Sequence, residues 1–300
     1  MSEALVEATL RLAAPLLLAA LGELWAERAG VVNIGIEGTM LWGAFAGFAV
    51  AVATGSAAAG VAAAGLAGAA VGALFALFAV WRGADQIVVG TAVNLLALGG
   101  TALAARALWS GAPPAAPRVG PVFDAGTLPL AGALLRQTGF AWAGLALALA
   151  SGLALRATRA GLRLRAVGES ARAADAEGVP VAATRALAVV LGSALAGIAG
   201  SALVLSLSDS FSEGMTAGRG FIALAIVIFG RWRASGVLAA SLFFGAATAL
   251  QFRLQARGGA IPYPVFLMLP YLLTLAVLAL ASGRARAPGD LGRAYRREAT

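Results

Sequence analysis

The sequence contains no cysteine, no histidine and no lysine, and each absence removes a class of function. Without cysteine or histidine there is no thiolate nucleophile, no disulfide framework and no Cys/His metal site. The sequence therefore predicts no cofactor in this chain. Without lysine there is no Walker-type phosphate-binding loop, whose motif requires a lysine beside the nucleotide phosphates. The chain thus lacks this kind of site for hydrolysing ATP, and we expect it not to be an enzyme.

Charged residues are also scarce. They make up 12% of the chain, whereas hydrophobic residues make up 60%, and there are 39 glycines in 300 residues. The segment 38–81 has no charged side chain, and a hydrocarbon core takes about 20 helical residues per crossing. We therefore predict an all-α, polytopic transmembrane helix bundle. Its membrane domain covers residues 1–285, and residues 286–300 form a cytoplasmic tail.

The formal net charge of +8 raises the alternative of a nucleic-acid partner. The arginines are distributed over short loops between apolar segments and do not form one basic face with interleaved aromatic residues. We expect membrane lipids and no nucleic acid as partners, and a positive charge that sets the topology. The first ten residues carry Glu3 and Glu7 and lack the basic flank of a signal peptide.

Apolar windows with few or no charged residues predict about eight full spans. They are 5–24, 38–54, 57–81, 87–108, 140–155, 186–207, 234–252 and 263–281. Two further stretches, 29–36 and 220–230, are apolar or glycine-rich and too short to cross, which indicates short or broken membrane segments. The similar order of long span, break and long span in both halves suggests a two-fold internal repeat of parallel orientation.

Three connections predict the sidedness of the chain. The segment 110–138 has five prolines and little charge, as expected of an irregular external loop. The segment 156–185 is rich in arginine, so the positive-inside rule places it in the cytoplasm. The arginines after residue 282 place the tail on the same side. A parallel repeat also places the N-terminus in the cytoplasm.

Polar side chains near the glycine breaks are the candidates for a solute pathway. Asn33 and Glu37 lie among glycines before the second span, and Asn94 lies inside the fourth. Polar groups at membrane depth are costly and are retained where they face a cavity or a partner. Glu37 is therefore predicted to line a pathway or to join two helices, or else it marks the aqueous end of its span. Asn94 either joins helices or contacts a polar solute.

The aromatic residues Trp42, Phe45 and Phe221 are further candidates for a pathway that accepts an uncharged solute. The alternative is that they pack between helices or face lipid. Small residues at four-residue spacing, such as Gly43 and Gly47, are typical of close helix packing.

The cytoplasmic segment 161–180 predicts a short ordered helix. Ser170 is a suitable N-cap for a helix over 171–177, and Gly178 with Pro180 ends it. Because two helical turns are unstable alone in water, the helix is expected to dock on another surface. That surface is either a partner protein or the chain's own helix bundle.

Five motifs, in this order, resemble the membrane permease subunits of bacterial ABC importers for nucleosides and simple sugars, within the wider group of ribose and branched-chain amino acid permeases. The resemblance extends from residue 5 to about residue 295. The motifs are GVVNIGIEG at 30–38, QIVVGTAVNLLAL at 86–98, GLRLRAVGE at 161–169, EGMTAGRGFIAL at 213–224 and IFGRW at 228–232.

This resemblance implies a subunit of the cytoplasmic membrane that translocates nucleosides or simple sugars. It implies an ABC ATPase subunit as partner, a second and paralogous permease subunit, and an extracellular solute-binding lipoprotein. The segment 161–178 then resembles the helix that couples the permease to the ATPase, although Ser170 replaces the usual Asn. The matching residues are Arg165, Gly168, Glu169, Arg172, Ala173, Ala174 and Gly178.

Two other classes compete with this interpretation. An ion-coupled secondary transporter of a small polar solute has a similar architecture but usually needs intramembrane carboxylates, of which Glu37 is the main candidate. An intramembrane enzyme is disfavoured because the spans contain no histidine, cysteine or paired carboxylates.

Overall fold

The computed structural model describes residues 3–109, 111, 114–123, 131–256, 268, 272 and 286–295. Within these residues the fold is helical, apart from one isolated bridge between Pro121 and Thr138. The predicted all-α membrane bundle is confirmed, because seven of the helices are long and apolar enough to cross a membrane. The eighth predicted span, 263–281, lies outside the described residues except at positions 268 and 272.

The seven long helices match the predicted spans to within a few residues. α3 and α9 each continue into a π-helical turn, at Leu77–Trp81 and Leu203–Ser208. Four shorter helices are α5 (Ala131–Leu135), α7 (Arg159–Glu169), α8 (Ala171–Ala176) and α10 (Arg219–Phe229). The long helices are α1 (Glu3–Arg28), α2 (Ile36–Thr54), α3 (Ala57–Ala76), α4 (Gln86–Leu108), α6 (Gly139–Ala157), α9 (Val181–Ala202) and α11 (Ala234–Ala256).

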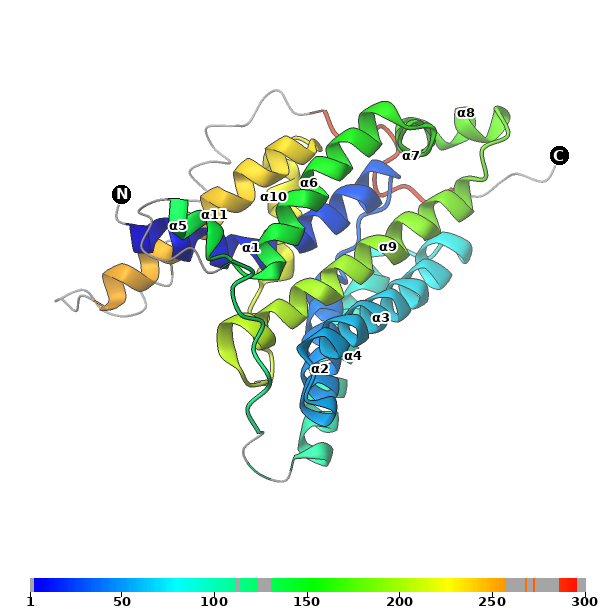
Figure 1. Cartoon of the computed structure of the whole chain (residues 1–300). Coiled ribbons are helices and arrows are strands. Elements are labelled where there is room, and N and C mark those ends of the chain that lie inside the picture. The colour runs from blue at the N-terminus through cyan, green and yellow to red at the C-terminus, as the bar shows by residue number, and fades with distance from the viewer. Residues whose placement is uncertain are drawn as a thin grey trace.

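One end of the bundle is formed by α7, α8, the end of α1 and the start of α9. A Cβ on Gly168 of α7 would lie only 2.1 Å from the carbonyl oxygen of Arg28. Arg185, near the start of α9, donates a hydrogen bond to the Ala29 carbonyl at 3.0 Å. Figure 1 shows the same arrangement, with α1 running from the N-terminus to the end where α7 and α8 lie. By the positive-inside rule this is the cytoplasmic end.

The described start of α1, at Glu3, lies at the opposite end of the bundle. Glu3 forms an ion pair of 2.6 Å with Arg136, which follows α5. The proline-rich segment packs on the far end of α9, where Val119 N–H donates to the Leu205 carbonyl at 2.8 Å. The predicted cytoplasmic N-terminus is therefore wrong, because α1 is one continuous helix that ends, and does not begin, at the cytoplasmic face.

The two halves of the chain run in opposite directions. α1 runs toward the cytoplasmic end, and the chain then turns back into the bundle before α2 begins. α9 runs away from that end, and the chain then turns back into the bundle before α10 begins. This is the layout of an inverted repeat, as in many transporters. The predicted parallel repeat is wrong, since an apolar window carries no information about the direction in which a helix crosses.

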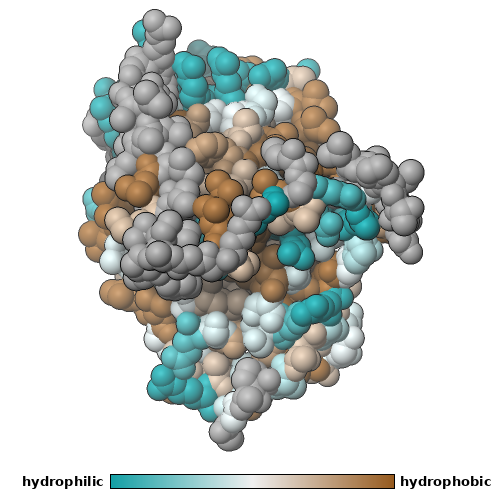
Figure 2. All heavy atoms as spheres, turned by 90° about the vertical axis from the view of Figure 1, so that its left-hand side faces the viewer, coloured by the Kyte–Doolittle hydropathy of each residue, from teal (hydrophilic) through white to brown (hydrophobic). Residues whose placement is uncertain are grey.

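Small residues let α9 pack closely against α1, α2 and α3. A Cβ on Gly197 would lie 2.1 Å from the carbonyl oxygen of Ala64 in α3, and one on Gly200 would lie 1.9 Å from that of Met40 in α2. A Cβ on Gly22 of α1 would lie 2.2 Å from the Gly192 carbonyl oxygen. The small residues thus determine helix contacts, as predicted. In Figure 2 hydrophobic residues lie mainly in the middle and left of the face, and hydrophilic ones at its upper edge, on its right side and in its lower part.

Candidate functional site

The break before α2 is held in place by one face of α4. Val32 N–H donates to the Gln86 side-chain oxygen at 2.8 Å, and Gly38 N–H donates to the Asn94 oxygen at 2.8 Å. The Asn94 amide nitrogen donates to the Ile34 carbonyl at 3.0 Å. Backbone groups freed by a broken helix need such partners at membrane depth. Asn94 thus joins two helices, which is one of its two predicted roles.

Gly90 allows the broken segment before α2 to approach α4 closely. It lies between Gln86 and Asn94 at four-residue spacing, so the three residues share one face of the helix. A Cβ on Gly90 would lie 2.7 Å from the backbone nitrogen of Gly35. Any side chain there would displace the segment that the two amides hold.

Glu37 connects the first break, residues 29–35 between α1 and α2, to the second break, residues 209–218 before α10. Its Oε1 accepts a hydrogen bond from Gly218 N–H at 2.8 Å, and its Oε2 accepts one from Gly220 N–H at 2.6 Å. These N–H groups lie at the start of α10, where a helix has unpaired donors and a partial positive charge. Gly218 has φ +82°, which favours glycine. Glu37 therefore joins two helices at the breaks and does not simply mark the end of a span.

Two buried carboxylates of α1 complete the arrangement. Asn33 N–H donates to Glu23 at 2.8 Å, and the Asn33 amide donates to the hydroxyl of Ser193 in α9 at 3.2 Å. One turn further along α1, Glu27 accepts a hydrogen bond from the indole N–H of Trp232, just after α10. Sequence reasoning missed Glu23 and Glu27. Their four-residue spacing at the end of an apolar run was the available signal.

The aromatic candidates lie in different surroundings. Phe45 is buried in a cluster of rings, with centroids 6.0 Å from Trp42, 6.1 Å from Trp109 and 5.5 Å from Phe211. Edge-to-face geometry of this kind is typical of packing. Phe221 lies on α10 and is 48% exposed. The breaks thus bring together Asn33, Glu37 and Asn94, whereas Phe45 belongs to the ring cluster. Their part in solute passage stays a prediction.

The second break is also fixed at its outer end. Arg106 of α4 donates two hydrogen bonds to Glu213 at 2.8 and 3.0 Å. These hydrogen bonds hold the pKa of the Glu213 carboxyl below its ordinary value. Among the described residues there is no cluster of acidic residues suited to a metal ion.

The predicted cytoplasmic helix is present as α8. The Ser170 hydroxyl accepts a hydrogen bond from Ala173 N–H at 3.3 Å, and Gly178 has φ +80° after the helix. Sequence reasoning missed α7, which precedes it and carries the half-buried Arg165. The signal was Thr158, a typical N-cap residue, whose hydroxyl accepts from Gly161 N–H at 3.0 Å.

Exposure divides the residues that the resemblance assigns to coupling. Glu169, Arg172 and Ala173 are exposed to solvent. Gly168 is buried, and it packs so closely on α1 that a Cβ there would meet a carbonyl oxygen of that helix. Ala174 is buried in a small apolar cluster between α7, α8 and the start of α9. The first three residues are available to a partner, and the last two attach the α7–α8 unit to the bundle.

The C-terminal segment 286–295 fastens this unit to the first break. The Asp290 carboxylate accepts a hydrogen bond from Ala171 N–H at 2.7 Å, and Gly292 N–H donates to the Gly30 carbonyl at 3.0 Å. The Tyr295 hydroxyl donates to a carboxylate of α8 at 3.0 Å. The described part of the tail thus lies at the same end of the bundle as α7 and α8.

Comparison with known proteins identifies the family. Residues 5–278 match the family described as the permease component of branched-chain amino acid transport systems. The chain belongs to this permease family. It is therefore a multi-pass membrane component of an ABC transporter and not the ATPase, which is a separate subunit. The family implies an ATPase and a solute-binding protein as partners.

The permease has relatives of nearly equal length. It is 38% identical to the guanosine ABC transporter permease protein NupQ of Bacillus subtilis, over 97% of this chain and 96% of the relative. It is 36% identical to a putative glucose ABC transporter permease, TsgC13, of Haloferax volcanii, over 98% of each chain. The nucleoside ABC transporter permease NupC of Lactococcus lactis is 35% identical over 91% and 90%. No solved structure matches the permease.

Proposed function

We propose that this permease translocates nucleosides, with simple sugars as the second candidate class, across a bacterial cytoplasmic membrane. The complete importer contains a second, paralogous permease subunit, cytoplasmic ABC ATPases and an external solute-binding lipoprotein. Two of the relatives described above are named for guanosine and nucleosides and one for glucose. Asn33, at the first break, keeps a buried amide oxygen without a hydrogen-bond partner among the described residues, and such a neutral acceptor suits an uncharged solute with hydroxyl and amide groups.

The observation that carries this proposal is the continuous contact from the exposed α7–α8 unit to both breaks. The unit rests on the end of α1 at Arg28 and on the first break through the tail. α1 then holds the first break through Glu23 and the end of α10 through Glu27. Glu37 joins the two breaks to each other.

This connection suggests how ATP drives transport. When the ATPase subunits close, they move the α7–α8 unit, and the end of α1 moves with it. Because α1 holds the first break and Glu37 joins the first break to the second, the two breaks shift together, which changes the side from which the pathway is open. Packed interfaces of this kind change between discrete arrangements and do not deform gradually.

The solute class is tested by competition. Cells that carry the complete transporter are given labelled guanosine, with unlabelled nucleosides, ribose, glucose and branched-chain amino acids as competitors. We expect unlabelled nucleosides to abolish labelled uptake and amino acids to leave it unchanged. Full competition by a sugar or an amino acid, without competition by nucleosides, contradicts the nucleoside assignment and leaves the permease assignment intact.

A further inference from the structure

A cavity of about 660 Å³ opens at the cytoplasmic end of the bundle, between α6, α7 and the turn from α10 to α11. Four arginines from these elements and from α1 line it, and none of the described residues that line it is acidic. They are Arg28, Arg156, Arg165 and Arg233. The cavity is separate from the two breaks and from the exposed face of α8.

Three of the arginines, Arg28, Arg165 and Arg233, lie close enough for their charges to interact. The charges of Arg165 and Arg233 both act unfavourably on Arg28, and Glu169, which does not line the cavity, offsets this only in part. Arg28 is held in position by a hydrogen bond of 2.7 Å from its Nε to the Trp232 carbonyl. The Nε of Arg165 is buried without a hydrogen-bond partner among the described residues. Such a cluster favours an anion, because an anion supplies both the opposite charge and the missing acceptor.

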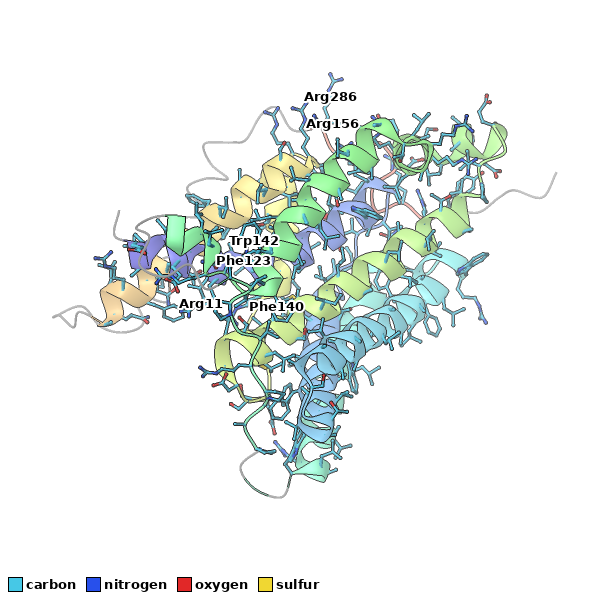
Figure 3. All side chains as sticks on the ribbon, viewed as in Figure 1. Arg11, Phe123, Phe140, Trp142, Arg156 and Arg286 are labelled. Carbon is cyan, nitrogen blue, oxygen red and sulfur yellow. The ribbon has the colours of Figure 1, made fainter. Side chains whose placement is uncertain are left out.

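The other wall of the cavity is apolar and lies on two membrane-spanning helices. It is formed by Ala148, Leu149, Gly152 and Leu153 of α6, with Leu238 of α11. Leu149 and Leu153 are each 69% exposed, and they lie on a helix that crosses the bilayer. Arg156, one turn further along α6, lies at the same upper edge of the molecule as Arg286 in Figure 3. A ligand here therefore meets arginines at the interface and leucines at the depth of the acyl chains.

We propose that this cavity binds an anionic phospholipid of the cytoplasmic leaflet, with its phosphate among the arginines and its acyl chains along α6. Basic pockets between helices on this side of a membrane are suited to such head groups. An acidic protein surface fits less well, because it cannot cover the exposed leucines within the span. The bound lipid contacts α1, α6, α7 and the α10–α11 turn together and stabilises the cytoplasmic end of the permease.

The test uses the complete transporter, purified in detergent, stripped of lipid and then given phosphatidylglycerol or phosphatidylcholine. Native mass spectrometry measures retained lipid, and thermal unfolding measures stabilisation. We expect phosphatidylglycerol to be retained and to raise the unfolding midpoint, and phosphatidylcholine to do neither. The double variant Arg156→Gln/Arg233→Gln is expected to retain at least tenfold less, whereas the charge-matched control Arg159→Gln/Arg163→Gln, outside this cavity, retains the wild-type amount.

Two further arms separate lipid from other anions and binding from misfolding. Glycerol phosphate and inorganic phosphate are expected not to reproduce the stabilisation, and if either does, the site is one for a free phosphate. Gly152→Phe fills the apolar wall and keeps all four arginines, and we expect it also to lose the lipid. Arg156→Lys/Arg233→Lys keeps the charge and is expected to restore binding. Equal retention by wild type, Arg156→Gln/Arg233→Gln and Gly152→Phe overturns the proposal.

Discussion

Glu37 shows how much a single residue can determine in this fold. Its two carboxylate oxygens accept from two backbone N–H groups at the start of α10, 181 and 183 residues away in the chain. The negative charge also faces the positive end of that helix. Because the same residue lies in the first turn of α2, it fixes both breaks with one side chain.

Glu37→Gln tests this role at nearly constant shape. An amide has one acceptor oxygen and one donor group, so one N–H at the start of α10 loses its partner. Loss of such a cap costs about 1–2 kcal/mol, and we expect at least a tenfold lower uptake rate. Uptake and thermal unfolding of the purified transporter measure the two effects. Glu7→Gln, near the start of α1, is the control, and wild-type uptake and stability in Glu37→Ala contradict the role.

A second prediction at the residue scale concerns the Asn94 side chain. Asn94→Leu keeps a similar volume but leaves Gly38 N–H and the Ile34 carbonyl without their partners. Each unsatisfied group costs about 1–3 kcal/mol, so the variant should be less stable than the nearby apolar exchange Leu95→Ala, at a side chain that is 65% exposed. Thermal unfolding in the same detergent ranks them. If Asn94→Leu is as stable as wild type, Asn94 does not hold the break.

At the scale of elements, α4 acts as a support for the broken segment. Gly90→Ala puts a Cβ 2.7 Å from the backbone nitrogen of Gly35, so either α4 or the broken segment before α2 must shift. Gly99→Ala in the same helix meets nothing within 4 Å and should gain about 0.5–1 kcal/mol from the better helix propensity of alanine. We expect Gly90→Ala to lose transport and Gly99→Ala to keep it. Equal uptake by both variants contradicts the role of α4.

A separate prediction concerns the α7–α8 unit. Arg172 is exposed on α8, and Arg172→Glu reverses its charge without filling a buried site. We expect ATP hydrolysis to continue while uptake falls at least tenfold, at an unchanged amount of permease in the membrane. Ala174→Trp is the contrasting variant. Ala174 is buried, so that change should lower the amount of folded permease. If Arg172→Glu transports normally, the exposed face of α8 does not dock on the ATPase.

Several elements could be predicted from the sequence because their signals are local. Apolar windows located seven spans, and Ser170 with Gly178 located α8. The directions of the two halves could not be predicted, since a hydrophobic window is the same read from either side. The contact between Glu37 and α10 could not be predicted either, because it joins residues far apart in sequence. Glu23 was missed because its contact with Asn33 depends on how the chain turns back after α1.

At the scale of the whole molecule, the inverted repeat brings the two breaks together inside the bundle. One break is entered from the cytoplasmic side after α1, and the other is entered from the opposite side after α9. The first break is tied to α1, and Glu37 ties the second break to the first, so the α7–α8 unit at the cytoplasmic end is connected to both. We therefore predict that ATP, and not an ion gradient, drives the solute through this permease.

The most direct test measures labelled guanosine uptake into proteoliposomes that contain the complete transporter and its solute-binding protein. We predict uptake that requires ATP at the cytoplasmic face, stops when the ATPase subunit loses its Walker lysine, and continues when ionophores collapse the proton and sodium gradients. Uptake that an ion gradient drives through the permease without ATPase subunits contradicts this account and supports a secondary transporter.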